Sequence, residues 1–265
     1  MLLRKNKNKM KKLRLHQFLT RTGLFTSKKE LIKAIKDGEI KIEDRITTSP
    51  IYQFDPEKET AYWKGKKIET VEDIYIILNK PEGYISSRLT NYDKKMGKKS
   101  VFAIIEKDTA IDEKTKNSLF CVGRLDEDTS GLLIITNDGK LCSELTDPKH
   151  EVEKTYQVKL EAPLDEATKT KIEQGVVIWL EENGKIIDYK TKPCKIEPIE
   201  KDKLRIVLKE GKKREIRRIF EAEENNVLEL KRVKIGGLDL ENLGLKKSQF
   251  IYTDLKTLKE ALEKH

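Results

Sequence analysis

The sequence has few of the residues that build disulfide frameworks or metal sites. Its 265 residues include only three cysteines and three histidines. The cysteines show no CxxC spacing and the histidines no ligand pattern, which argues against a disulfide framework and against a zinc site. These six residues are Cys121, Cys142, Cys194, His16, His150 and His265. We therefore expect no bound metal, and a protein that works in a reducing compartment.

Long apolar runs are also missing. No stretch approaches the roughly 18 apolar residues that a membrane-spanning helix needs. The N-terminus is basic, but no apolar segment follows it as in a secretory signal. These two absences predict a cytoplasmic protein with no membrane partner.

The positive charge of the chain is concentrated at its N-terminal end. The formal net charge is +9. Residues 1–60 contain 15 Lys and Arg against 8 Asp and Glu, whereas the rest of the chain contains 40 against 38. This asymmetry is typical of an appended nucleic-acid-binding module. The alternative interpretation is an ordinary lysine-rich solvated surface.

The N-terminal region divides into an arm and a compact unit. Residues 1–12 contain six basic residues and no acidic one, which predicts a flexible basic arm. Apolar residues at helical spacing then predict a first helix from Leu13. Ser27 and Glu30 have the spacing of a capping box and predict a second helix. Short strands and turns follow, including a turn at Asp44-Arg45, so we expect a small domain over residues 13–68.

The second region, residues 73–265, contains more strands than helices. Apolar runs at 74–78 and 132–135 predict buried strands, and alternation over 155–160 predicts a half-buried one. Helices are expected at 101–105, 140–145, 164–175, 214–224 and 255–262. Strands and helices do not alternate one for one, so the pattern favours an α+β fold with a mixed, mainly antiparallel sheet flanked by helices and loops.

One loop in this region carries the strongest chemical signal. Asp126 follows Gly123-Arg124-Leu125 and precedes Ser130-Gly131 and the buried strand that begins at Leu132. Loops fixed beside a rigid strand often carry chemistry. Taken alone, however, an aspartate in a polar loop is more often a turn or cap residue.

Several separated segments together resemble a known family. The segments are Asn79 to Tyr84, Gly123 to Gly139, Lys154 to Tyr156, and Glu210 to Gly236. In this order they resemble the RsuA/RluB/RluE/RluF branch of bacterial ribosomal-RNA pseudouridine synthases. Residues 13–67 are similar to an S4 RNA-binding domain, so the resemblance covers nearly the whole chain.

The resemblance implies an isomerase that needs no cofactor. Such an enzyme breaks the N1–C1′ bond of a uridine, turns the base and rejoins it through C5. It implies that Asp126 is the catalytic nucleophile or base, that Arg217 is its cationic partner, and that Tyr156 packs against the base. Because a uridine inside a stacked helix is unreachable, we expect it to be flipped into the pocket. The nucleophilic and the deprotonation routes for Asp126 both stay open.

The resemblance also suggests residues that contact RNA. Cationic side chains expected to bind phosphate are Arg124, Lys28, Lys29, Lys212, Lys213, Arg214 and Arg218. Ile216 and Leu238 correspond to positions that line the pocket in the family. The alternative for the charged residues is ordinary solvation, and for the two apolar residues an ordinary place in the core.

The chain departs from the family pattern at three places. Glu215 stands where Gln is usual, and a carboxylate there could compete for Arg217 or repel phosphate. Glu43-Asp44 replaces the usual Asn-Gly turn of S4 domains. Lys28-Lys29 stands where Ser-Arg is common, so the charge is kept while the RNA contact differs.

The sequence therefore predicts a monomeric enzyme that acts on structured ribosomal RNA, either a free stem-loop or an assembly intermediate. It leaves open the target uridine and the ribosomal subunit. A non-catalytic S4-type RNA-binding protein is the second hypothesis. A retaining glycosidase is the third; it would need a second carboxylate about 5 Å from Asp126.

Overall fold

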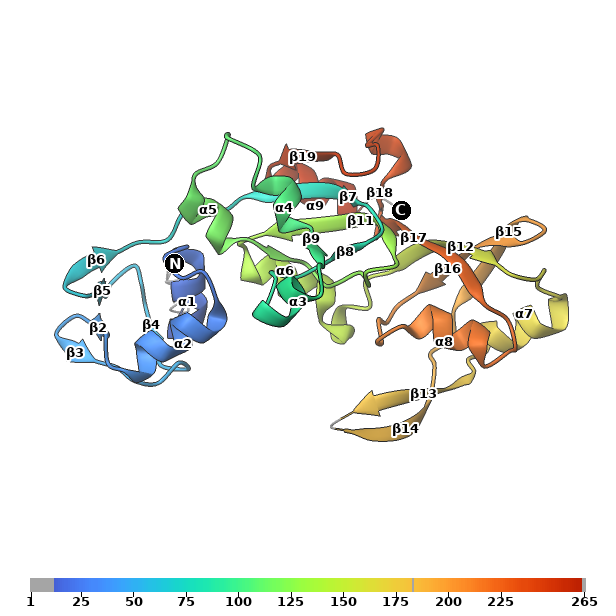
Figure 1. Ribbon diagram of the computed structural model, residues 1–265, viewed down its shortest axis with the longest axis horizontal. Helices are drawn as coiled ribbons and strands as arrows, with labels where there is room; N and C mark the ends of the chain where they lie inside the picture. Colours follow the sequence, from blue (N-terminus) through green and yellow to red (C-terminus); the bar gives the residue numbers. More distant parts are fainter. Residues whose placement is uncertain (1–11, 183, 264–265) are drawn as a thin grey trace, which may run out of the picture. The chain divides into compact units, whose positions relative to one another are not determined.

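The computed structural model describes residues 12–182 and 184–263 of the chain (Figure 1). The basic arm expected over 1–12 lies, apart from Lys12, outside the described residues. The chain divides into two units, and their division does not follow chain order. Of the described residues, one unit contains 12–74 with 108–119 and 137–139, and the other contains the rest. No helix in the described ranges is both long and apolar enough to cross a membrane.

Two helices form one side of the first unit. The helices α1 (Leu15–Arg21) and α2 (Lys28–Lys36) place Phe18 and other apolar residues in a common core. Ser27 caps α2 by accepting a hydrogen bond from the Glu30 backbone. The predicted capping box is incomplete, because the Glu30 carboxylate accepts from the backbone and hydroxyl of Thr26 instead.

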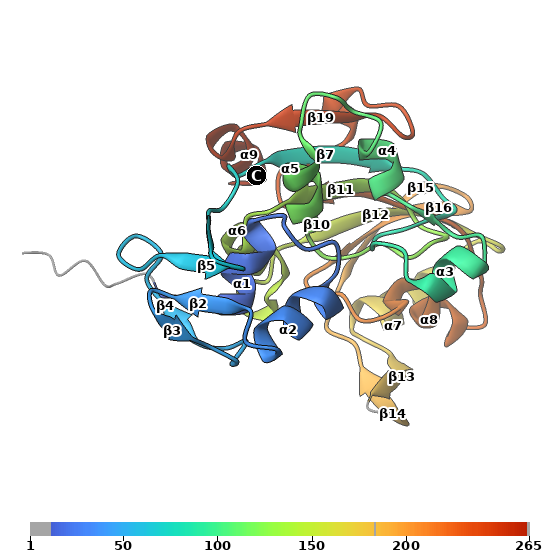
Figure 2. The same ribbon diagram turned by 60° about the vertical axis from the view of Figure 1, so that its left-hand side comes forward.

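Short strands complete this core (Figure 2). The strands β2 (Ile40–Ile42), β3 (Arg45–Ile46), β5 (Ala61–Trp63) and β6 (Lys66–Ile68) form an antiparallel sheet in the order β3-β2-β5-β6. The strands β1 (Leu13–Arg14) and β4 (Gln53–Phe54) pair separately. The turn between β2 and β3 is at Glu43-Asp44, one residue earlier than expected, and Glu43 takes a φ of +51°. This left-handed conformation suits the Asn-Gly that Glu43-Asp44 replaces better than it suits Glu.

Two later segments join the first unit. The helix α5 (Glu113–Ser118) passes so close to Gly23 that a Cβ there would lie 1.8 Å from the carbonyl oxygen of Lys114. The Asn137 side chain accepts from the Ile74 backbone at 2.8 Å and donates to the Ser118 hydroxyl at 3.1 Å. These contacts explain why short segments distant in sequence group with the N-terminal residues.

A mixed, mainly antiparallel sheet forms the second unit, as predicted. Its strand order is β15-β16-β12-β17-β11-β7-β19, with β10 and β18 beside β11 and β17. Only the β11–β17 pairing is parallel among the described strands of this sheet. Its strands are β7 (Tyr75–Lys80), β10 (Phe120–Cys121), β11 (Ser130–Thr136), β12 (Lys154–Leu160), β15 (Lys195–Glu200), β16 (Lys203–Leu208), β17 (Val227–Ile235), β18 (Leu238–Asp239) and β19 (Phe250–Thr253). Both predicted apolar strands, β7 and β11, are buried along their whole length.

Helices and two apolar clusters stabilise this sheet. One cluster joins β12 and β16 to α7 and α8, and the other joins β7 and β11 to α6 and α9. The remaining elements of the unit are α3 (Asn91–Lys95), α4 (Phe102–Ile105), α6 (Gly139–Thr146), α7 (Glu166–Glu173), α8 (Glu215–Glu221), α9 (Leu255–Glu263), η1 (Pro148–His150), η2 (Glu241–Leu243), and the paired strands β8 (Tyr84–Ile85) and β9 (Lys99–Ser100). The predicted helices at 101–105, 140–145, 164–175, 214–224 and 255–262 correspond to α4, α6, α7, α8 and α9, with shorter bounds for most.

A hairpin that the sequence reading missed extends from the second unit (Figure 1). It consists of β13 (Val177–Glu182) and β14 (Lys185–Lys190), paired antiparallel. Ile178 and Leu180 belong to the apolar core, whereas Trp179 is on the opposite face. Asn-Gly between alternating apolar residues is a strong hairpin signal, and it is present at 183–184.

Candidate active site

The candidate site is built on the loop between β10 and β11. This loop contains Asp126 and returns to the sheet through a turn in which Thr129 N donates to Asp126 O at 3.1 Å. Gly131 then has a φ of +105°, and a Cβ there would lie 2.1 Å from the carbonyl oxygen of Arg232. Only glycine permits this close approach of β11 to β17. The close pairing of β11 with β17 therefore fixes the C-terminal end of the loop.

Lys80 anchors the loop from the neighbouring strand β7. Its ammonium donates to the carbonyl oxygens of Asp126 at 3.0 Å, Thr129 at 2.6 Å and Pro81 at 3.1 Å. The side chain has no exposed surface, and burial lowers the pKa of Lys80 to about 8, against the attraction of nearby carboxylates. At neutral pH most of the population is still protonated and able to fill these acceptors.

Ser86 provides a second anchor on the same side. Its hydroxyl donates to Leu125 O at 2.8 Å and accepts from Leu125 N at 3.1 Å. Gly83 N donates to Glu127 O at 2.8 Å. The segment after β7 thus holds both neighbours of Asp126, Leu125 and Glu127. These bonds join the first of the segments that resemble the family to the loop that contains Asp126.

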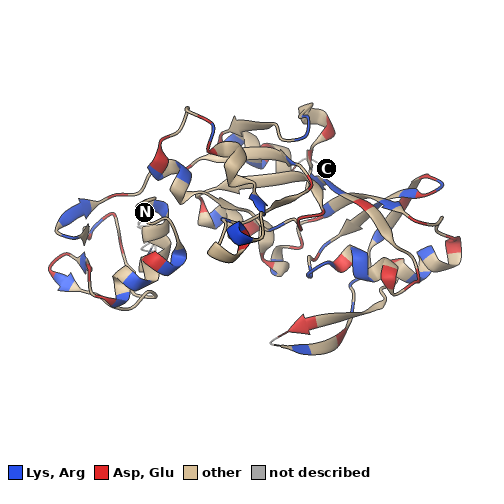
Figure 3. Ribbon diagram, in the orientation of Figure 1, with Lys and Arg blue, Asp and Glu red and all other residues tan. Residues whose placement is uncertain are grey.

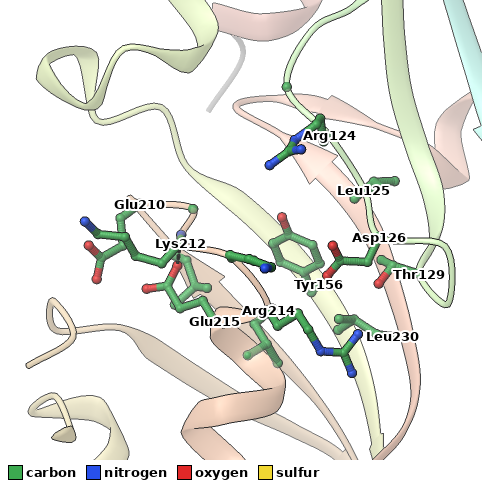
Figure 4. A pocket seen from close by; sticks show the side chains of 15 residues that line it. Arg124, Leu125, Asp126, Thr129, Tyr156, Glu210, Lys212, Arg214, Glu215 and Leu230 are labelled. Carbon is green, nitrogen blue, oxygen red and sulfur yellow. Dashed lines mark hydrogen bonds between the residues drawn. The ribbon is translucent and has the colours of Figure 1, made fainter. Parts of the chain in front are cut away.

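Asp126 is half-buried in the wall of a pocket of about 260 Å³. Figure 4 shows its carboxylate directed toward the ring of Tyr156, which projects from β12. A bulge in the pairing of β12 with β17 occurs between Thr155 and Tyr156. The other lining residues are Gly123, Arg124, Leu125, Thr129, Leu208, Glu210, Gly211, Lys212, Lys213, Arg214, Glu215, Ile216 and Leu230.

Arg217 does not pair with Asp126, which corrects the sequence expectation. Its Nε lies 3.1 Å from Oδ2 of Asp128, close enough for an ion pair but not aligned as a hydrogen bond. Its other nitrogens donate to Asp128 O at 3.0 Å and Val227 O at 2.8 Å. The two carbonyls hold the guanidinium between Asp128, inside the turn that follows Asp126, and Val227 at the start of β17. Arg217 and Asp126 nevertheless border the same larger cavity.

Arg214, Lys212 and Lys213 form a basic wall of the pocket that Asp126 also lines. Arg214, at the start of α8, has a φ of +55° and lies 3.2 Å from Asp128 Oδ2. The Lys212 ammonium lies 4.4 Å from the centre of the Tyr189 ring, and Lys213 is exposed. Together with the exposed Arg124, these side chains give the pocket a cationic rim, and their contact with RNA phosphate stays a prediction.

Arg218 is not part of this rim, contrary to the prediction. It is 5% exposed, and its guanidinium carbon lies 3.9 Å from the centre of the Trp179 ring. Its Nη1 donates to Lys213 O at 2.8 Å. Arg218 faces the hairpin from α8, so the aromatic ring replaces water around the charge and phosphate cannot reach it.

Of the two residues predicted to line the pocket, one does and the other does not. Ile216 is buried and lines the pocket. Leu238 lies on β18 in the apolar cluster of β7 and β11, away from the lining, so that prediction is wrong. Leu208 and Leu230 supply apolar surface to the pocket instead.

Glu215 is buried in the pocket wall, and it does not compete for Arg217. Its Oε2 accepts from Lys212 N at 2.7 Å. Burial, with the neighbouring Glu210, raises the pKa of Glu215 to about 8. Burial also acts on Glu210, but hydrogen bonds from the Tyr189 hydroxyl and Lys192 N outweigh it and lower the pKa of Glu210.

Lys28 and Lys29 are exposed at the start of α2 in the first unit. Figure 3 shows basic residues along α2. Nowhere in 12–182 or 184–263 do three His, Cys, Asp or Glu side chains cluster as metal ligands would.

Comparison with known proteins identifies the family. Residues 74–222 match the family model of RNA pseudouridylate synthases. The chain belongs to this family. A Vibrio cholerae protein named ribosomal small subunit pseudouridine synthase A is 32% identical over 231 residues, covering 86% of this chain and 91% of that protein. Ribosomal large subunit pseudouridine synthase B of Bacillus subtilis is 32% identical over 236 residues, covering 87% and 88%.

A solved structure extends the comparison to the fold. A crystal structure of a pseudouridylate synthase matches 94% of this chain and 99% of its own, with a TM-score of 0.63 and 28% identity. The chain is thus an RNA-modifying isomerase with a pseudouridine synthase fold.

Sequence reasoning missed three residues of this pseudouridylate synthase that shape the site. They are Lys80, Ser86 and Asp128. For Lys80 a signal was present, since a lysine ending a continuous apolar strand must satisfy its charge inside the protein. Ser86 and Asp128 gave no such signal, because both sit in polar segments.

Proposed function

We propose that this synthase converts a specific uridine of ribosomal RNA to pseudouridine, with Asp126 as the catalytic carboxylate. The main support is the half-buried Asp126 at the pocket wall, facing Tyr156 in a pocket that has a basic rim. One relative is named for the small ribosomal subunit and another for the large one, which supports ribosomal RNA as the substrate. Such a substrate also favours the cytoplasm as the place of action.

The reaction moves one glycosidic bond and adds no atoms. The N1–C1′ bond breaks, the base turns, C5 bonds to C1′, and C5 loses a proton while N1 gains one. Asp126 serves either as the nucleophile at C1′ or as the base that deprotonates the sugar after cleavage. Tyr156, stacked against the base, would limit its movement while it turns, and Ile216, Leu208 and Leu230 would exclude water.

The basic side chains offset the cost of flipping. Extracting a uridine from its stack costs a few kcal/mol. Arg124, Lys212, Lys213 and Arg214 surround the pocket and would bind the flanking phosphates. Arg217 would act through Asp128, holding the loop in register rather than neutralising Asp126.

We also propose that different parts of the chain bind the RNA and carry out the reaction. Residues 1–12 and an S4-type domain over 13–68, with Lys28 and Lys29, would bind a structured stem-loop or assembly intermediate. Residues 73–265 would perform catalysis, and the protein would act as a monomer. Two short helices with exposed lysines beside a small sheet support this role for the first unit.

The decisive variant is Asp126→Asn, with Asp188→Asn as control because Asp188 is exposed on β14. Both would be incubated with small- and large-subunit ribosomal RNA from a strain lacking the protein, and pseudouridines would be mapped. We expect modification by wild type and control, and none by Asp126→Asn, with RNA affinity within a few-fold. An active Asp126→Asn enzyme would exclude the assigned role. If no protein modified the RNA but all bound it, the non-catalytic hypothesis would replace this one.

A further inference from the structure

Two carboxyl groups meet in the pocket wall away from Asp126. Glu210 follows β16, and Glu215 begins α8. They are 8% and 4% exposed, and both line the pocket. No lysine or arginine nitrogen forms an ion pair with either among the described residues; the nearby Lys212 ammonium lies 3.8 Å from Glu182 instead. Two buried carboxylates without an ion-pair partner cannot both be ionised at low cost.

The hydrogen-bond donors around the pair are unevenly distributed. Glu210 accepts from the Tyr189 hydroxyl at 2.5 Å and from Lys192 N at 2.7 Å. Glu215 Oε2 accepts from Lys212 N at 2.7 Å, while its buried Oε1 has no donor from the described residues. A proton on Glu215 would turn its contact with Glu210 into a hydrogen bond and remove this deficit.

The surroundings favour the proton on Glu215. Tyr189 donates to Glu210 from β14, and the carboxyl charges also act electrostatically on Lys154 of β12 and on Cys194. Lys212 is the nearest cation on the pair's own loop, and Glu182 adds negative charge from β13. Burial raises the pKa of Glu215, whereas donated hydrogen bonds lower that of Glu210. A protonated Glu has nearly the shape of Gln and, like Gln, can donate a hydrogen bond, with one O–H in place of two N–H donors.

We infer that Glu210 and Glu215 share a single proton, and that this proton fixes residues 210–214 as the basic wall of the pocket. Those residues carry Lys212, Lys213 and Arg214, and the Lys212 backbone is bonded directly to Glu215. Loss of the proton would place two negative charges in the wall and displace the loop. Glu215 is thus a positioning residue, and the catalytic consequence rests on the proposed function.

The first test needs no RNA. In the folded protein Glu215 keeps its proton up to about pH 8, whereas in the unfolded chain it releases it near its ordinary pKa of 4.5. The stability from this proton is therefore complete below pH 4.5 and is lost as pH rises through 8. Thermal melting of the full chain from pH 5 to 9.5 should show a falling Tm in wild type and a flatter profile in Glu215→Gln and Glu210→Gln. Glu221→Gln, an exposed carboxylate on α8, should behave like wild type.

The second test uses single-turnover modification of ribosomal RNA over the same pH range. The rate of wild type relative to Glu215→Gln should be constant below pH 7 and fall roughly tenfold per pH unit well above 8. Equal Tm profiles for wild type and Glu215→Gln would overturn the shared proton. Distinct Tm profiles with a constant rate ratio would overturn the positioning role. Failure of every protein to modify RNA would refute the proposed function while leaving the melting result intact.

Discussion

Arg217 Nε lies 3.1 Å from Oδ2 of Asp128, the carboxylate two residues after Asp126 in the same loop. The arginine therefore fixes the loop through its backbone and its outer carboxylate. Lys80 fixes the same loop from β7, through the carbonyls of Asp126 and Thr129. Both cations therefore act chiefly on the chain around Asp126.

Arg217→Lys should lower the modification rate by roughly 10- to 100-fold, because one ammonium cannot reach Asp128 and Val227 together as the guanidinium does. The free energy of unfolding should fall by about 1–2 kcal/mol. Single-turnover kinetics and urea denaturation would measure both effects. Arg45→Lys, at an exposed position of β3, is the control, and a wild-type rate for Arg217→Lys would contradict the positioning role.

Lys80→Met should destabilise the protein by roughly 3 kcal/mol or more, because it leaves several buried carbonyl oxygens without donors. Modification should be lost even at temperatures where the variant is folded. Ser86→Ala offers a milder change that removes only the Leu125 contacts. If both variants unfold like wild type, the loop is held by other interactions.

Gly131→Ala should be severely destabilising, by more than about 3 kcal/mol, because its Cβ would collide with the Arg232 carbonyl and its φ is unfavourable for alanine. Gly139→Ala is the matched control, since Gly139 has open space around it and begins a helix. Chemical denaturation of the two variants would give the difference directly. Similar stabilities would mean that β11 and β17 can separate locally.

Arg214→Ala and Arg218→Ala should have different effects, although the two residues are only four positions apart. Arg214 faces the cavities, so its loss should reduce the slope of log K against log salt by about 1. Arg218 packs on Trp179, so its loss should leave that slope unchanged and lower stability by about 1–2 kcal/mol. RNA-binding titrations at several salt concentrations decide, and a reduced slope for Arg218→Ala would mean that the hairpin moves to expose it.

Features encoded locally could be predicted from the sequence. The short apolar runs at 74–78 and 132–135, bounded by turn residues, favour strands buried on both faces, and they form β7 and β11. Asp126 and Tyr156 do line one pocket, although they belong to separate segments. The resemblance to the family, rather than the local sequence pattern, predicted that these two residues share a site.

Partners fixed by three-dimensional packing could not be predicted. Arg217 and Asp128 are 89 positions apart, and whether the arginine reaches position 126 or 128 depends on where α8 lies against the loop. Leu238 and Leu230 are both buried apolar residues on strands, so the pattern could not tell which one faces the pocket. Arginine is usually a surface residue. Arg218 is buried because it packs against Trp179 of the hairpin β13–β14, which the sequence did not predict.

The two units alternate along the chain, which limits how one of them can be exchanged without the other. The chain passes between them at five places, after residues 74, 107, 119, 136 and 139. A gene fusion or truncation that exchanged only the N-terminal segment would leave Asn137 without Ile74 and α5 without Gly23. Exchange of the N-terminal segment between relatives would therefore require matched changes at these two later segments, so we expect the two units to evolve together rather than independently.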